Sequence, residues 1–306
     1  MHKDLQESFG GYTINMLEQY LDNHYDIHED YEFSMTLCNK VARIMKDAVS
    51  GKLDRDDAAM GLLGLKSEAN NQEFRIIKSM KFMIELLPQH RPSEEPNEMT
   101  LCSRYLNAFL LPLFDDPKNG TLFQWDDSIN PEVGATSATI SRRRPDNIIT
   151  VMNGEAFDYS RGYGEVKCHT QAKNKASIAK DLVQLGVFAK NCIDVHNMKA
   201  VLTFQAIGRK VTFFITKLMG DGVYTMYEIG EFNTPGSLQE TLQLLGYFDN
   251  LHLLLHAYDK HCVRLDTEDA QKLKEMKRAT LPTPDRDAIT KTTTNNKRRS
   301  ISKHPA

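Results

Sequence analysis

The stretch RRRPDNIITVMNGEAFDYSRGYGEVKCHT, residues 142–170, decides the interpretation of this chain. Its two apolar runs, PDNIITVM and GYGEVKC, are typical of buried β-strands, and an Asn-Gly turn signal lies between them. Each run also carries charge, because Asp146 lies near the start of the first and Glu165 and Lys167 lie inside the second. Alternate side chains share a face of a strand, so Glu165 and Lys167 project the same way. Pairing of the two strands would bring the Asp146 carboxylate beside them.

These side chains suit a divalent cation. Two carboxylates held close together repel each other, and a cation between them removes the conflict. Mg²⁺, or Mn²⁺ in its place, takes one or two carboxylates together with water and substrate phosphate. We therefore expect Asp146 and Glu165 to hold the metal, with the backbone carbonyl of Val166 or Cys168 as a further ligand. Lys167 would then orient the attacking water or stabilise transition-state charge on a phosphate.

A purely structural interpretation stays open. Lys167 paired with Glu165 or Asp146 could form a charged edge of a half-exposed sheet, and such pairs are frequent and weakly stabilising. Against this, three charged groups enter otherwise apolar strands together, and their burial without a metal or a substrate would be costly.

The segments around this stretch predict an α/β fold with a mixed sheet. Residues 97–113 have a helical pattern with Glu98 in the first turn, and a helix is also predicted at 174–194. Further strands are predicted at TLFQW, KAVLTFQAI, KVTFFITKL and VYTMYEIGEF, of which the last three form a meander. Residues 235–262 predict one long helix or two shorter ones.

The chain divides into three parts by composition. Up to about residue 90, apolar residues recur at spacings of three and four, which predicts an all-helical N-terminal region, 1–92. The segment HRPSEEPNE then brings prolines and acids, so we place a boundary there. The α/β domain spans 93–265, and 266–306 is expected to be a basic, largely disordered tail.

The motif and its setting resemble a known family. Pro145-Asp146, followed nineteen positions on by Glu165-Val166-Lys167, is similar to the signature of the PD-(D/E)XK nuclease superfamily. The resemblance covers roughly residues 97–230, including the αβββαβ order of the restriction endonuclease-like core. It implies that Asp146 and Glu165 are metal ligands, that Lys167 is the catalytic lysine and that Glu98 is the acid of the first core helix. It does not cover residues 1–90.

The resemblance implies a Mg²⁺- or Mn²⁺-dependent endonuclease that acts on DNA rather than RNA and leaves a 5′-phosphate. The alternative is a catalytically inactive member of the fold that binds nucleic acid or serves protein assembly. Residues 1–100 carry 11 Lys and Arg against 18 Asp and Glu. This acidic helical region could bind a protein partner or a second copy of the chain.

Basic residues near the motif are candidates for nucleic-acid contact. Residues 137–180 hold eight basic side chains against four acidic ones. The run Arg142, Arg143 and Arg144 would grip phosphates without sequence specificity, or would only solubilise a loop. A polar stripe with spacings of four, three and four is either a phosphate-binding face or a solvated one; its members are Lys173, Ser177, Lys180 and Gln184.

Other classes of site find little support. We expect no membrane span and no secretory signal, so an intracellular protein, and the cluster Lys297-Arg298-Arg299 is either a nuclear-import signal or part of a soluble tail. Single cysteines and adjacent Cys168-His169 do not suggest a zinc site. G-x-S-x-G and phosphate-binding glycine motifs do not occur. Tyr163 and Trp125 could stack on bases or belong to the core.

Overall fold

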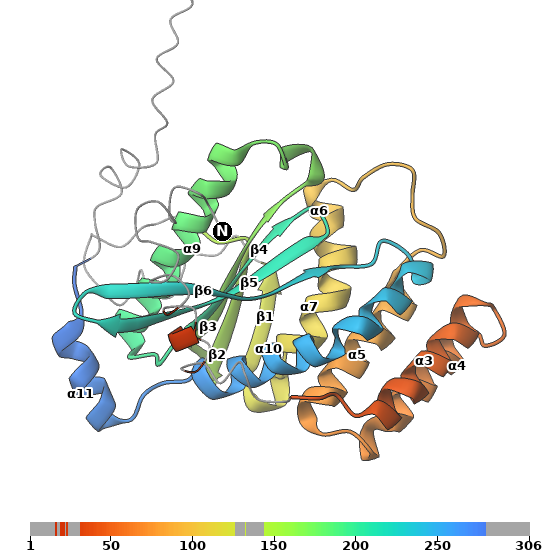
Figure 1. Cartoon of the computed structure of the whole chain (residues 1–306), viewed down its shortest axis with the longest axis horizontal. Coiled ribbons are helices and arrows are strands. Elements are labelled where there is room, and N and C mark those ends of the chain that lie inside the picture. Colours follow the sequence, from red (N-terminus) through yellow and green to blue (C-terminus); the bar gives the residue numbers. More distant parts are fainter. Residues whose placement is uncertain are drawn as a thin grey trace, which may run out of the picture.

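The centre of the molecule is a six-stranded mixed sheet (Figure 1). The computed structural model of the chain describes residues 31–125 and 144–279, together with residues 16, 19–21, 23 and 132. The strands lie in the order of the chain, and every neighbouring pair is antiparallel except the parallel pair β3 and β4. The strands are β1 (Thr121–Trp125), β2 (Asn147–Asn153), β3 (Ala156–Lys167), β4 (Val201–Ile207), β5 (Lys210–Gly220) and β6 (Val223–Asn233).

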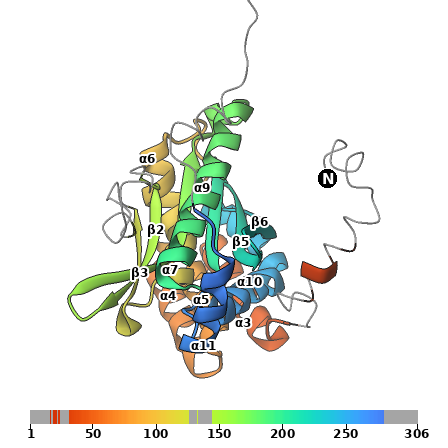
Figure 2. The ribbon, with the colours of Figure 1, turned by 90° about the vertical axis from the view of Figure 1, so that its left-hand side faces the viewer.

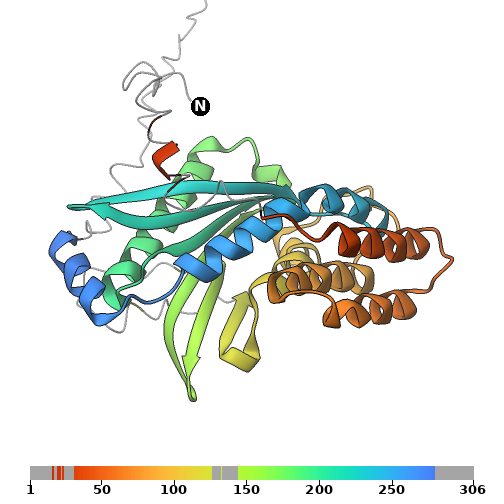
Figure 3. The ribbon, with the colours of Figure 1, turned by 60° about the horizontal axis from the view of Figure 1, so that its bottom comes forward.

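The connections explain this topology. β2 and β3 form a hairpin in which Asn153 pairs with Ala156, and Gly154 takes the positive φ of 64° that a tight hairpin turn requires. Figures 2 and 3 show this hairpin projecting from the body of the molecule. Parallel strands need a long crossover, and α9 (Lys175–His196) supplies it between β3 and β4. Short turns then make β4, β5 and β6 the predicted meander.

The sheet separates two hydrophobic cores. On one face, α9 packs on the sheet through Leu185 and Phe188, which surround Tyr163 of β3. The other face carries Val166 and Phe204 into the larger core. That core is covered by α5 (Asn71–Leu86), α7 (Asn107–Phe114) and α10 (Phe248–His261). Since Glu165 and Lys167 alternate with Val166, they lie on the α9 face.

The N-terminal helices α3 (Met35–Val49) and α4 (Arg55–Gly64) pack beside α5 at one end of the molecule (Figure 3). Asn70 and Glu73 form a capping box that starts α5, and Glu73 also accepts a hydrogen bond from the Ser34 backbone. Buried residues of these helices belong to the same core as those of α7 and the sheet. The boundary that we expected near residue 92 therefore does not separate two cores.

Most predicted elements are present, with some corrections. The mixed sheet and the α/β class are confirmed. The predicted helix at 97–113 is α6 (Glu98–Thr100), a π-helical segment (Leu101–Leu106) and α7 in succession. Segment 235–262 holds a 3₁₀-helix (Leu238–Tyr247) before α10. The expectation of a largely disordered tail from residue 266 is wrong for α11 (Thr267–Met276), whose Leu273 enters the smaller core. Among the described residues, no helix has the length and apolar character needed to cross a bilayer.

Candidate functional site

The hairpin brings Asp146 and Glu165 together. Asn147, the first residue of β2, pairs with Gly164 of β3, so Asp146 lies at the level of Glu165. The Oδ2 atom of Asp146 accepts a hydrogen bond of 2.7 Å from the backbone N–H of Val166. The carboxyl groups of Asp146 and Glu165 lie close enough that each shifts the pKa of the other. The two acids that the sequence placed on separate strands therefore form one pair.

Gly164 lets the strands pack closely at this point. A Cβ atom at Gly164 would collide with the ring of Phe204, which belongs to the adjacent strand β4 and lies in the larger core. The carboxyl pair therefore stands on a strand whose opposite face is packed too tightly for a side chain at this position.

Burial and mutual repulsion keep a proton in this pair. Glu165 is only 7% exposed. Burial, followed by the negative charges of Asp146 and Asp181, raises the pKa of Glu165 to about 9. Burial also raises the pKa of Asp146, although the Val166 N–H and the Lys167 ammonium oppose this shift. Without a cation, Glu165 is thus protonated at neutral pH.

Lys167 is held by Asp181 of α9. The Nζ atom of Lys167 lies 3.1 Å from Oδ2 of Asp181 and donates to the backbone carbonyl of Val166 over 3.1 Å. Burial works against the charged ammonium, but the close contact and charge of Asp181, followed by the charges of Asp146 and Glu165, raise the pKa of Lys167. The ammonium group therefore stays charged beside the two carboxyl groups.

Asp181 was missed by the sequence reasoning. The helix begins at Lys175 with Asn174 as its N-cap, so Lys173 precedes it and cannot belong to the predicted stripe. The stripe that faces the sheet runs through Asp181 and Gln184, three residues apart on one helix face. A stripe through residues 177, 181 and 184 has helical spacing and would have included Asp181. The stripe that we predicted passed through the neighbouring Lys180 instead.

The residues predicted to contact nucleic acid differ in their exposure to solvent. Lys173 and Lys180 are exposed, as a phosphate contact or a solvated face requires, and so is Arg144. Gln184 is buried, 8% exposed, and its Nε2 atom has no hydrogen-bond partner among the described residues. The four-residue stripe is therefore not one uniform surface. Arg142 and Arg143 lie outside the described residues, as does Lys297-Arg298-Arg299.

Glu98, at the start of α6, lies near the pair. Partial desolvation, then the charge of Asp146, raises the pKa of Glu98, which also interacts with Lys167 and Asp181. Cys102, on the π-helical segment one turn further, has its pKa raised to about 12 by burial and by Asp146 and Glu98. The sequence did not single out this thiol, which stays protonated.

The remaining candidates belong to the core or the surface. Tyr163 is fully buried and its ring lies 5.4 Å from that of Phe188, so it is a core residue and not a base-stacking platform. Trp125 donates from Nε1 to Asn107 over 3.0 Å and packs edge-on against Phe123. The Cys168 thiol contacts Thr170, and neighbouring His169 is exposed.

The donor set fits a cation that accepts few protein ligands. Within the described residues, no group of three or more His, Cys, Asp and Glu side chains is spaced to hold a metal ion. Mg²⁺ commonly binds through one or two carboxylates and keeps several waters. The pair of Asp146 and Glu165 meets that requirement, and its buried, mutually repelling carboxyl groups are ones that a cation would stabilise. The Val166 carbonyl, expected as a further ligand, accepts a hydrogen bond from the Lys167 ammonium and keeps a second lone pair.

Comparison of the chain with protein-family models, with curated proteins and with solved structures finds no significant match. The chemistry of the site itself therefore has to carry any assignment of function.

Proposed function

We propose that the protein is a metal-dependent nuclease of the PD-(D/E)XK type that hydrolyses phosphodiester bonds, with DNA as the expected substrate. One observation carries the proposal. Asp146 and Glu165, nineteen residues apart in the chain, are brought to the same level of two paired strands, and each interacts electrostatically with the other and with Lys167. Sites that gather groups with strongly raised pKa values are often functional ones.

The order of the elements supports this proposal. A helix that begins at Glu98, then β1, β2 and β3, then the crossover helix α9 and β4, follows the αβββαβ order of the restriction endonuclease-like core. In the family signature, the first acid follows a proline at one strand and the acid-x-lysine lies on the next strand. Asp146 directly precedes β2, and Glu165 and Lys167 end β3.

Each residue of the site would have its own role in phosphodiester hydrolysis. Asp146 and Glu165 would hold Mg²⁺, which supplies Lewis-acid stabilisation of charge on a phosphate. The Val166 N–H fixes the orientation of the Asp146 carboxylate. Asp181 keeps Lys167 charged and positions it, so the ammonium can donate a hydrogen bond to a phosphate oxygen or to the attacking water. Glu98 is placed for an outer contact.

Binding of the nucleic-acid backbone is assigned to the exposed basic residues near this end of the molecule. Arg144 lies two residues before Asp146, and Lys180 lies beside Asp181 on α9. Contacts of this kind add affinity that depends on salt and not on base sequence.

A second candidate is an inactive member of the fold that binds nucleic acid or other proteins. The absence of a third metal-binding side chain in the described parts of the chain favours it. Exposed Met35 and Met60 on the N-terminal helices would suit a role in assembly.

A cleavage assay separates the two candidates. Purified full-length protein is incubated with plasmid, single-stranded DNA and RNA, with Mg²⁺, with Mn²⁺ and with chelator. We expect metal-dependent cleavage that falls by at least about 100-fold in Lys167→Ala and in Glu165→Gln. Glu231→Gln, on the surface of β6, is the matched control and should cleave normally. Salt-sensitive binding without cleavage by the wild-type protein would support the inactive module and overturn the nuclease.

A further inference from the structure

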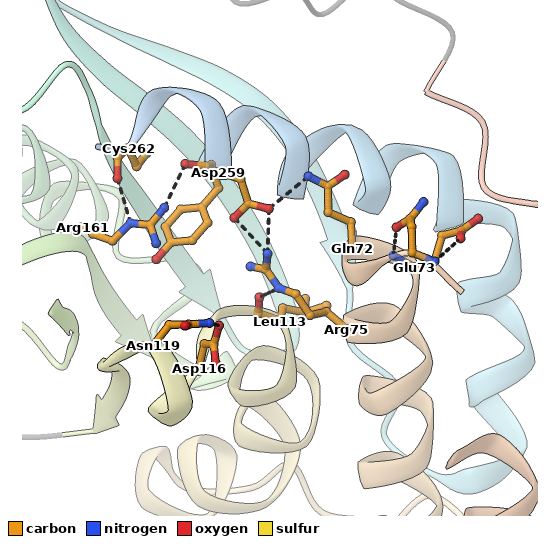
Figure 4. A network of polar contacts seen from close by, with 11 residues as sticks. Gln72, Glu73, Arg75, Leu113, Asp116, Asn119, Arg161, Asp259 and Cys262 are labelled. Carbon is orange, nitrogen blue, oxygen red and sulfur yellow. Dashed lines mark hydrogen bonds and ion pairs between the residues drawn. The ribbon is translucent and has the colours of Figure 1, made fainter. Parts of the chain in front are cut away.

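A cavity of about 450 Å³ is lined by residues of α5, β3 and α10 and by neither member of the acid pair; Figure 4 labels several of its lining residues. Exposed Asn71 and Asn119 are among its lining residues, so it opens to solvent. Its volume lies in the range of small-molecule sites. Three of the lining side chains are basic, and they come from two elements that are far apart in the sequence: Arg75 and Lys78 of α5, and Arg161 of β3.

A β-bulge aims Arg161 into this region. Ile149 pairs with Gly162 and the next residue, Thr150, pairs with Ser160, which leaves Arg161 as the extra residue of β3. Strict alternation would put Arg161 on the α9 face with Tyr163. Instead, its Nε atom donates to the Cys262 carbonyl over 2.7 Å, and its guanidinium lies 4.2 Å from the centroid of the Tyr258 ring. Bulges often re-aim a side chain in this way at functional sites.

The two basic residues of α5 share one helix face. Arg75 is anchored: it donates to the Leu113 carbonyl over 2.5 Å and to Asp259 over 2.9 Å (Figure 4). Lys78, three residues on, makes no hydrogen bond or ion pair with the residues that the structure describes; its recorded ring contact is with Phe74, at 6.0 Å. Like charges at this spacing destabilise a helix slightly, so their placement has a cost.

The acids around the cavity are already engaged. Asp259 binds Arg75 and accepts from Gln72. Asp115 accepts a hydrogen bond from the Phe123 backbone, and Asp116 accepts one from Asn119. Lys78 therefore interacts with Asp115 and Asp116 only over longer distances, and burial followed by the charge of Arg75 lowers its pKa. Arg161 donates to backbone carbonyls and not to a carboxylate.

We propose that this cavity binds a small phosphate-bearing molecule of about mononucleotide size, with Lys78 and Arg161 as the groups that contact the phosphate. Guanidinium and ammonium groups are the usual protein partners of phosphate oxygens. The cavity lies on the face of the sheet opposite to Glu165, so the proposal is independent of the nuclease activity.

Titration of the full chain with inorganic phosphate, pyrophosphate, AMP and ATP tests this site. Chelator is present throughout, and acetate serves as the control anion. We expect at least one phosphate compound to bind with a Kd below about 1 mM. Lys78→Gln should weaken that binding at least tenfold, because it removes a charge without breaking a hydrogen bond. The matched control is Lys81→Gln on the same helix, whose partner is Glu85, and it should bind normally.

Two further measurements make the result decisive. Arg161→Lys keeps the charge but loses the planar fork, so it should also weaken binding while thermal unfolding confirms that it is folded. Glu165→Gln should bind as the wild type does, which distinguishes this cavity from the acid pair. Absence of saturable binding up to about 10 mM would overturn the proposal. Equal losses in Lys78→Gln and Lys81→Gln would overturn it too.

Discussion

Strand β3 carries charged side chains on both faces of the sheet, and the surroundings of these charges differ between the two faces. On the α9 face, Glu165 lies near the carboxyl groups of Asp146 and Asp181. The Lys167 ammonium is the positive charge that acts on it. On the other face, Arg161 is matched by two backbone carbonyls and the ring of Tyr258. The first cluster has excess negative charge when it is fully ionised, whereas Arg161 keeps its positive charge with backbone carbonyls, and no carboxylate, as hydrogen-bond acceptors. Burial alone therefore does not show what a charged group is for.

The largest expected effect is on stability at high pH. The pKa of Glu165 is about 9 in the folded protein and about 4.3 in an unfolded chain, so the folded state binds the extra proton between these values. The free energy of unfolding should then fall as pH rises, by on the order of a few kcal/mol between pH 5 and 9. Denaturant unfolding in chelator measures this.

Glu165→Gln should flatten that pH dependence, and the protein should be more stable than the wild type near pH 9. Glu231→Gln, an exposed control, should keep the slope of the wild type. If the free energy of unfolding changes with pH equally in all three proteins, Glu165 does not have the raised pKa that this prediction requires.

Replacing the charged residue on the other face by glutamine should lower the free energy of unfolding, whereas Glu165→Gln should raise it at high pH. Arg161→Gln leaves the carbonyls of Tyr258 and Cys262 without their charged donor and should cost about 1–3 kcal/mol at any pH. Arg91→Gln breaks an exposed pair with Glu95 and should cost less than about 1 kcal/mol. Chemical denaturation compares them. If Arg161→Gln lowers the free energy of unfolding no more than Arg91→Gln does, the hydrogen bonds of Arg161 to backbone carbonyls do not stabilise the fold as proposed.

The smallest effect concerns Asp181. Asp181→Asn removes the charge that raises the pKa of Lys167, so the ammonium should lose its proton at lower pH. We expect cleavage to fall roughly tenfold or less, with the alkaline limb of the pH–rate profile moved to lower pH. Asp194→Asn, which breaks the pair with Lys190 on the same helix, is the control and should leave the profile unchanged. An unmoved alkaline limb in Asp181→Asn would remove its positioning role.

Local patterns were enough to predict the acid pair. Asp146, Glu165 and Lys167 lie in one hairpin, where strand alternation and a tight turn fix which side chains meet. Prediction of Asp181 required the correct helix face of α9. The predicted stripe included Lys180, one position away, and therefore missed Asp181. The cavity could not be predicted, because the bulge reverses the face of Arg161 and its partners at α5 and α10 approach only in the tertiary structure.

The central claim is that Asp146 and Glu165 form a cation site that holds a proton when no metal is bound. Titration calorimetry with Mg²⁺ and Mn²⁺, in buffers of different ionisation enthalpy near pH 7, measures both the binding and the protons released. We predict saturable binding that releases about one proton per ion, since the proton of Glu165 must leave. Binding should be lost in Asp146→Asn. Titrations that do not saturate, or that are the same for the wild type and Asp146→Asn, would contradict the account.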